Sequence, residues 1–222
     1  MELGKTLLAL GALALSGCSV SFTDLKDALL SPDTVPEMTI PAVNRAAIES
    51  ADLAAVMILS PTTGISSVAV AVQLRDAGVI YNGNDNRGVT LQKGLIYQTL
   101  GFGTNLQAVL TTPDDPIALG TPPAAWPDTV TRTYLIAGRG TRYDEITATC
   151  QLTVGGATEV TVVGVTHRVL EAVEQCETDT GESFNNIHYV DARSGQIWRS
   201  SQWTGPVQQN VQIDVIEPFD AN

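Results

Sequence analysis

The sequence predicts an all-β protein, mainly antiparallel, whose strands form a large curved sheet, a sandwich or a half-open barrel with a few short helices. Hydropathy alternates with a period of two in many short runs between about residues 53 and 217, a pattern typical of half-buried strands. Clusters of Gly, Asn, Asp and Pro separate these runs, as turns do. About a dozen strands in one twisted sheet must curl, split into two layers or close.

Two short helices are expected before the strands begin. Apolar residues at helical spacing predict a helix over residues 22–30. Three prolines from position 32 to position 41 then keep the chain extended. A second helix is expected from Pro41 to about Ala51, because proline is favoured at the first helical position and alanine favours helix.

A meander of antiparallel strands is expected next. Residues 68–74 alternate large apolar side chains with small or polar ones, which predicts a strand with one bulky face and one small face. The Asn- and Gly-rich stretch 81–86 is a turn signal, because both residues tolerate positive φ. Further β runs follow at 88–92 and 95–100.

The middle of the chain is expected to leave the sheet. Residues 106–110 predict one helical turn capped by Thr104 or Asn105. Five prolines between residues 111 and 128 exclude a continuous helix or strand and predict a long loop.

The second half of the chain repeats the strand pattern. Gly155-Gly156 and Arg193-Ser194-Gly195 are expected to be tight turns. The strands expected in this half are residues 131–137, 144–154, 158–165, 167–176, 186–191, 196–203 and 210–217.

Cys18 closes the sequence Leu15-Ser16-Gly17-Cys18, directly behind a short apolar run that follows Lys5. This order is typical of a bacterial lipoprotein signal, in which the cysteine is acylated and becomes the new N-terminus. An ordinary secretory signal that happens to abut a cysteine is the alternative. The apolar run has about 10 residues, whereas a helix needs about 20 to cross a bilayer, so lipid tethering is expected.

Three parts of the chain are expected on this basis. They are a signal peptide (1–17), a lipidated N-terminus with a short helix and linker (18–45), and a single β-rich domain (46–222). The net charge of −12 repels phosphate backbones, so nucleic acid is not expected as a partner. Ser19, in place of the Asp that retains lipoproteins at the inner membrane, favours sorting to the outer membrane.

Once Cys18 is assigned to lipid, Cys150 and Cys176 remain as an even pair in a compartment that permits disulfides. A disulfide between them is expected. Two buried free thiols or a metal site are the alternatives, and His167 and His188 show no ligand spacing with the cysteines. No metal or other cofactor is therefore expected.

No catalytic residues are expected. A Gly-x-Ser-x-Gly motif is absent, and His167 and His188 lie within β runs, where a structural histidine is the ordinary case. The acids most suggestive of glycosidase chemistry are expected to form a solvated surface; they are Asp114, Asp115, Glu171, Glu174 and Glu177. Tyr189, Trp198 and Trp203 are candidate contacts for a glycan or a partner, although aromatic residues at β spacing more often belong to the core.

Two longer stretches carry a family resemblance. The first runs from Gly94 to Gly101 and continues with Asn105-Leu106. The second runs from Glu171 through residues 185–191 to the segment 194–203 and Pro206. With the acylation signal, they resemble the YjbF/GfcB family of outer-membrane lipoproteins, which is associated with exopolysaccharide and group 4 capsule production. The resemblance covers about residues 50–217.

The resemblance implies a non-enzymatic lipoprotein on the periplasmic face of the outer membrane that assists export or assembly of an exopolysaccharide or capsule. Its partners would be the membrane through its lipid, the polysaccharide and proteins of the export machinery. One alternative is a periplasmic carrier of lipid or lipoprotein, with an apolar cup of several hundred Å³. A less favoured alternative is a polysaccharide-modifying enzyme, which requires two buried acids facing each other in a cleft.

Overall fold

The computed structural model describes residues 40–138 and 142–220, which lie within one compact unit of the chain, Val35–Asn222. The expected signal peptide, Cys18 and the helix expected at 22–30 lie outside the described residues. Within the described part, no helix combines the length and the apolar character needed to cross a bilayer.

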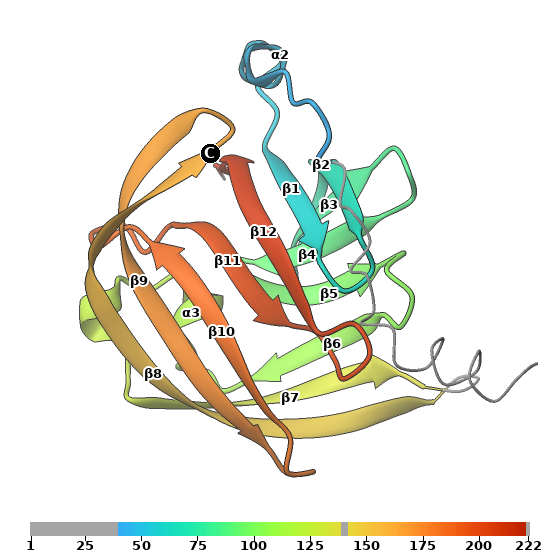
Figure 1. Cartoon of the computed structure of the whole chain (residues 1–222), viewed down its shortest axis with the longest axis vertical. Coiled ribbons are helices and arrows are strands. Elements are labelled where there is room, and N and C mark those ends of the chain that lie inside the picture. Colours follow the sequence, from blue (N-terminus) through green and yellow to red (C-terminus); the bar gives the residue numbers. More distant parts are fainter. Residues whose placement is uncertain (1–39, 139–141, 221–222) are drawn as a thin grey trace, which may run out of the picture. The chain divides into compact units, whose positions relative to one another are not determined.

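Twelve strands of the described part form one antiparallel sheet (Figure 1). Strands that follow each other in sequence also pair with each other, except β5 and β6, and β1 pairs with β12. The sheet therefore curls into a nearly closed barrel whose open seam lies between β5 and β6, which confirms the predicted fold class. The strands are β1 (Ala55–Ser60), β2 (Ile65–Arg75), β3 (Gly78–Gly83), β4 (Gly88–Gln92), β5 (Leu95–Leu100), β6 (Leu106–Thr111), β7 (Thr129–Ala137), β8 (Tyr143–Val162), β9 (Val165–Thr178), β10 (Ser183–Val190), β11 (Ile197–Trp203) and β12 (Asn210–Glu217).

Side chains supply hydrogen bonds to the two strands at the seam. Gln202 of β11 accepts a hydrogen bond from the backbone N–H of Ile96 at 3.0 Å and donates one to the carbonyl of Gly94 at 2.7 Å. Thr99 Oγ1 accepts a hydrogen bond from the N–H of Leu106 at 2.9 Å. These bonds give partners to main-chain groups near the edges of the sheet, where an unpaired group would be costly.

The helices are short and lie outside the sheet. The helix expected from Pro41 begins later, as α2 (Arg45–Ser50), because Asn44 Oδ1 caps it by accepting the N–H of Ala47 at 3.2 Å. The proline-rich loop has no continuous element, as predicted, but it contains α3 (Pro116–Leu119) and the 3₁₀ turn η1 (Pro123–Ala125).

The helical turn expected at residues 106–110 was wrong. This segment is β6, which pairs with β7 in a register that places Leu106 opposite Ile136 and Val109 opposite Tyr134. Leu106 and Val109 are buried in the barrel interior. Pairing and burial override the weak helical preference of a five-residue run.

The tight turn expected at Gly155-Gly156 was also wrong. Both glycines lie inside β8, where the register with β9 shifts between Val154 and Ala157 as a β-bulge. The chain instead turns at Val163-Gly164, where φ is 43° and 79°. Positive φ at both central residues is characteristic of a type I′ hairpin turn.

The described residues contain two hydrophobic clusters. One fills the barrel, with Val56, Ile58 and Trp203 among its members. The other lies on the outer face, where Met57 and Ile216 pack with residues from the far end of the β8–β9 hairpin. Figure 1 shows this hairpin end curling back over the sheet, and Arg199 Nη2 bonds the Thr161 carbonyl there at 3.1 Å.

Candidate functional site

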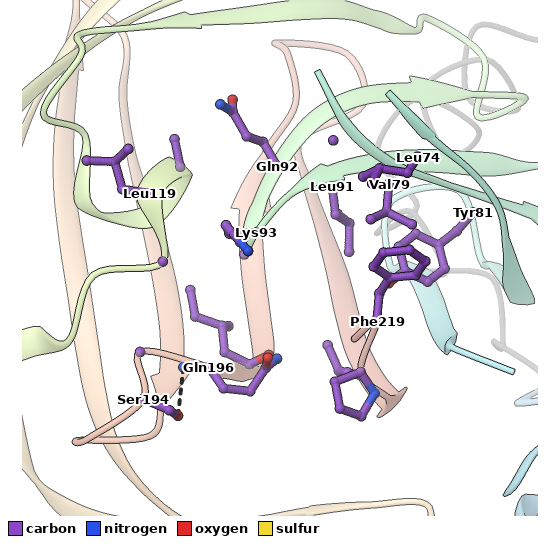
Figure 2. A pocket seen from close by; sticks show the side chains of 18 of the residues that line it. Leu74, Val79, Tyr81, Leu91, Gln92, Lys93, Leu119, Ser194, Gln196 and Phe219 are labelled. Atoms are coloured by element: carbon purple, nitrogen blue, oxygen red, sulfur yellow. Dashed lines mark hydrogen bonds between the residues drawn. The ribbon is translucent and has the colours of Figure 1, made fainter. Parts of the chain in front are cut away.

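A cavity of about 470 Å³ lies at one end of the sheet, beside the carboxyl ends of β2, β4, β10 and β12. Neighbouring strands run antiparallel, so even-numbered strands all end at the same end of the barrel. The segments that follow these strands form the wall of the cavity, together with the end of α3 (Figure 2).

One side of the cavity is apolar. Leu74, Val79, Leu91, Tyr81 and Phe219 lie together there (Figure 2). Tyr81 is 4% exposed, and burial raises the pKa of its hydroxyl to about 12. The phenol therefore stays neutral at physiological pH and does not add charge to this side.

The other side of the cavity is polar and carries Gln92, Lys93, Ser194 and Gln196 (Figure 2). The turn between β10 and β11 is held in place by Asp191, whose carboxylate accepts the N–H and the hydroxyl of Ser194 at 2.8 and 2.9 Å. The side chain of Lys93 forms no salt bridge or hydrogen bond with any other described residue. Its ammonium group is available to a ligand.

Two glycines allow the segments that line the cavity to lie close together. A Cβ atom at Gly195 would lie 2.4 Å from the main-chain oxygen of Gly120, and one at Gly94 would lie 2.3 Å from Cδ1 of Ile197. Any larger residue would push these segments apart. Gly94 and Gly195 belong to the two stretches on which the family resemblance rests, so those stretches meet at the cavity.

A buried charged cluster inside the barrel joins β7, β9, β10 and β11 to Asp115, the residue that caps α3. The Arg132 guanidinium binds Asp115 at 2.6 and 3.2 Å and Glu174 at 2.7 and 2.8 Å. Asn186 donates a hydrogen bond to Glu174 at 2.7 Å and accepts one from the backbone N–H of Trp203 at 2.8 Å. The side chains of Arg132, Asp115 and Glu174 are 0% exposed.

Asp115 links this cluster to the cavity. Its Oδ1 also accepts the backbone N–H groups of Ile117 and Ala118, at 3.0 and 3.1 Å, and so caps the first turn of α3. Leu119 is the last residue of α3 and lines the cavity. Arg132 therefore positions one wall of the cavity by holding the proline-rich loop against the barrel.

The cluster predicts acid sensitivity. Burial, the largest single effect, would raise the pKa of Glu174, but the charge of Arg132, the contact with His188 and the hydrogen bonds to the carboxylate together outweigh it and hold that pKa well below its usual value. A depressed folded-state pKa contributes stability above the unfolded pKa of about 4.3, and this contribution is lost as the pH falls further. We expect the free energy of unfolding to fall by up to about 1.4 kcal/mol per pH unit through this group as the pH drops below 4.3.

Urea unfolding at several pH values between 7 and 3 checks this expectation. The Glu174→Gln variant should show a shallower loss of stability with acid than the unmodified protein. Glu159→Gln is the matched control, because Glu159 is an exposed acid on β8 and takes part in no salt bridge of the described residues. Equal acid slopes for the unmodified protein and Glu174→Gln would contradict the assignment.

Cys150 and Cys176 lie directly opposite each other on β8 and β9, and their sulfur atoms are bonded at 2.07 Å. These sulfur atoms and a Glu174 carboxylate oxygen lie within 4.8 Å of one another, a spacing that could hold a metal ion. Disulfide sulfurs are not thiolate ligands, and Glu174 is already bound to Arg132. With Cys150 and Cys176 joined in a disulfide, these three residues therefore do not favour a metal ion.

The three candidate contact aromatics do not lie together. Trp203 is 3% exposed and stacks on Phe184 with ring centroids 4.5 Å apart, so its ring cannot act as a surface contact in this structure. Trp198 and Tyr189 are half-buried beside the outer cluster. Trp198 stacks on His167, with centroids 3.7 Å apart. One face of the Trp198 ring is thus already occupied by a side chain of the protein.

His188 is buried in the barrel, edge-on to Trp126, and does not line the cavity. Its Nε2 lies 3.4 Å from Glu174 Oε2 without hydrogen-bond geometry, and its Nδ1 has no hydrogen-bond partner within the described part of the chain. It therefore contacts the charged cluster but has no position from which to act on a ligand in the cavity.

The expectation that Asp115 and Glu174 lie on a solvated surface was wrong. Each is fully buried because it shares the guanidinium of Arg132, which stands 17 and 42 residues away in sequence. One signal was present: Asp115 directly precedes Pro116, and Asp followed by Pro marks a helix start. Nothing in the local sequence of Glu174 indicates its partner.

Comparison with known families identifies the chain. Its sequence matches the family described as "Group 4 capsule polysaccharide lipoprotein gfcB, YjbF" over residues 23–216. The chain belongs to this family. Membership confirms the resemblance noted in the sequence, and the YjbF family is described by its members' lipoprotein character and not by an enzymatic activity. A comparison with curated proteins gave no match.

A solved structure shares the fold of this YjbF-family chain. It is that of the hypothetical lipoprotein YmcC from Escherichia coli K12, with a TM-score of 0.69 and 17% sequence identity. The similarity covers 90% of this chain and 97% of the other. At this level of identity the match establishes a common fold.

Proposed function

We propose that this YjbF-family protein is a non-enzymatic lipoprotein that is anchored at the periplasmic face of the outer membrane and assists export or assembly of an exopolysaccharide or capsule. The family match over residues 23–216 is the observation that carries the proposal. Cys18 supplies the acylation site, and Ser19 is compatible with sorting to the outer membrane. Proteins of the polysaccharide export machinery are the expected partners.

The buried acids support a non-enzymatic role. Asp115 and Glu174 approach the same group, as two catalytic carboxyls would, but that group is the Arg132 guanidinium and neither acid lines the cavity. A glycosidase needs one protonated and one ionised carboxyl beside the scissile bond, with room for substrate between them. A pair of carboxylates bound to a buried arginine offers neither condition.

Deletion and complementation of the gene test the proposed role. We expect deletion to reduce surface polysaccharide, measured as cell-bound uronic acid or hexose, and the unmodified gene to restore it. The Cys18→Ala variant, which removes the acylation site, should fail to restore it. The Ser19→Asp variant should also fail, because it is still acylated but should be retained at the inner membrane.

The role would be contradicted if deletion left both the amount and the composition of surface polysaccharide unchanged. Incubation of the purified protein with the polysaccharide provides the matching test for catalysis. We expect its chain length and composition to stay constant, and turnover would contradict a non-enzymatic role.

A further inference from the structure

We propose that the cavity binds an anionic amphiphile, whose carboxylate or phosphate group lies at Lys93 and whose apolar chain lies along Leu74, Val79, Leu91 and Phe219. Neither the family description nor the role in polysaccharide export specifies this ligand class, and the inference does not depend on that role. It rests on the charge, the backbone conformation and the apolar surface of the described residues.

Charge points to an anionic group. The chain carries 12 Lys and Arg against 24 Asp and Glu, so a cavity wall with net positive charge is opposite in sign to the protein as a whole. Among the described residues Lys93 is the only lysine, and its side chain has no ionic partner there. Arg75 and Asp76 also line the cavity and together add no net charge. The polar side therefore carries one net positive charge at Lys93.

The turn that holds Lys93 does not explain why a lysine stands there. Lys93 is the first residue of the two-residue turn between β4 and β5 and has a φ of 53°. Glycine is favoured at such a position, and another residue costs about 1–2 kcal/mol. The lysine stem also lies against Gly120, where a Cβ atom would be 3.3 Å from Lys93 Cγ. The backbone and Gly120 together direct the side chain along the cavity wall.

Exposed apolar side chains point to the second part of the ligand. Leu74, Leu119 and Phe219 are 56%, 55% and 37% exposed, yet all three line this one cavity. Their surface is mainly aliphatic, whereas sugar rings are usually held by exposed aromatic faces. A volume of about 470 Å³ lies within the range of small-molecule sites. An alkyl chain attached to an anionic group satisfies both sides of the cavity.

Photo-crosslinking in a membrane tests the proposal on the full lipidated protein. The protein is reconstituted in nanodiscs of a neutral phospholipid and exposed to a fatty acid that carries a diazirine on its chain. The alkyl phosphate and the neutral alcohol with the same chain serve as parallel probes. Peptide mass spectrometry should locate the label in residues 74–79, 91–97 and 215–219.

Two pairs of variants separate the anionic contact from the apolar one. Lys93→Gln should lower labelling by the fatty acid and the alkyl phosphate about tenfold, the loss of one charge-assisted contact, and leave the alcohol unchanged. Leu74→Ser should lower labelling by all three probes. Arg168→Gln and Leu110→Ser are matched controls, because both residues are exposed and lie outside the cavity lining.

The Lys93→Gly variant separates loss of ligand binding from loss of protein stability. Glycine accepts the positive φ at this position, so its urea midpoint should equal or exceed that of the unmodified protein while anionic labelling still falls. Labelling outside the three segments, or unaffected by Lys93→Gln and Leu74→Ser, would overturn the proposal. Protection of the cavity by a uronate oligosaccharide without an alkyl chain, as effective as that by unlabelled fatty acid, would overturn it as well. A fatty acid and an alkyl phosphate that differ in labelling would identify which anionic group is bound.

Discussion

Replacement of Arg132 by methionine is expected to destabilise the protein by about 3–5 kcal/mol. The guanidinium is 0% exposed and neutralises the carboxylates of Asp115 and Glu174, which would remain buried without a cation. The loss should appear as a lower urea midpoint with little change in the slope of the transition. Arg168→Met is the control, since an exposed arginine on a strand should change stability by less than about 0.5 kcal/mol.

A triple variant distinguishes loss of charge balance from loss of packing. Adding Asp115→Asn and Glu174→Gln to Arg132→Met removes both uncompensated charges, so part of the lost stability should return. If Arg132→Met were as stable as Arg168→Met, the cluster would not hold the proline-rich loop against the barrel.

Removal of the disulfide is the second large effect expected. Replacing Cys150 and Cys176 by alanine should cost about 3.5 kcal/mol, because the bond closes a loop with a sequence separation of 26 residues in the unfolded chain. Reduction of the unmodified protein with dithiothreitol should lower the urea midpoint to a similar extent. The double alanine variant should not respond to dithiothreitol. An unmodified protein whose midpoint is unchanged after complete reduction, verified by thiol labelling, would contradict this expectation.

The sheet could be predicted from sequence because its signal is local. Alternation with a period of two gave β4 and β5 with the bounds that the structure shows, at residues 88–92 and 95–100. Local signals failed where two structures were equally compatible with the same residues. Residues 106–110 suit a helical turn until β7 pairs with them, and Gly155-Gly156 suits a turn as well as a bulge.

The site could be predicted only in part, because its partners are distant in sequence. The stretches that contain Gly94 and Gly195 were singled out for their resemblance to a family, but only the fold shows that both contribute to one cavity. The local sequence suggested that Asp115 and Glu174 were surface acids, because it contains no information about their contacts with Arg132. The sequence around Lys93 indicates a turn, but only the arrangement of the strands shows that this turn lines the cavity.

The proposed role depends most directly on acylation at Cys18, since a periplasmic protein without lipid would lose its place at the membrane. Mass spectrometry of the native protein extracted from membranes measures this modification. The account predicts that the mature chain begins at Cys18, carries fatty acyl groups on that residue and lacks residues 1–17. A native chain that retains residues 1–17, or one whose Cys18 carries no lipid, would contradict it.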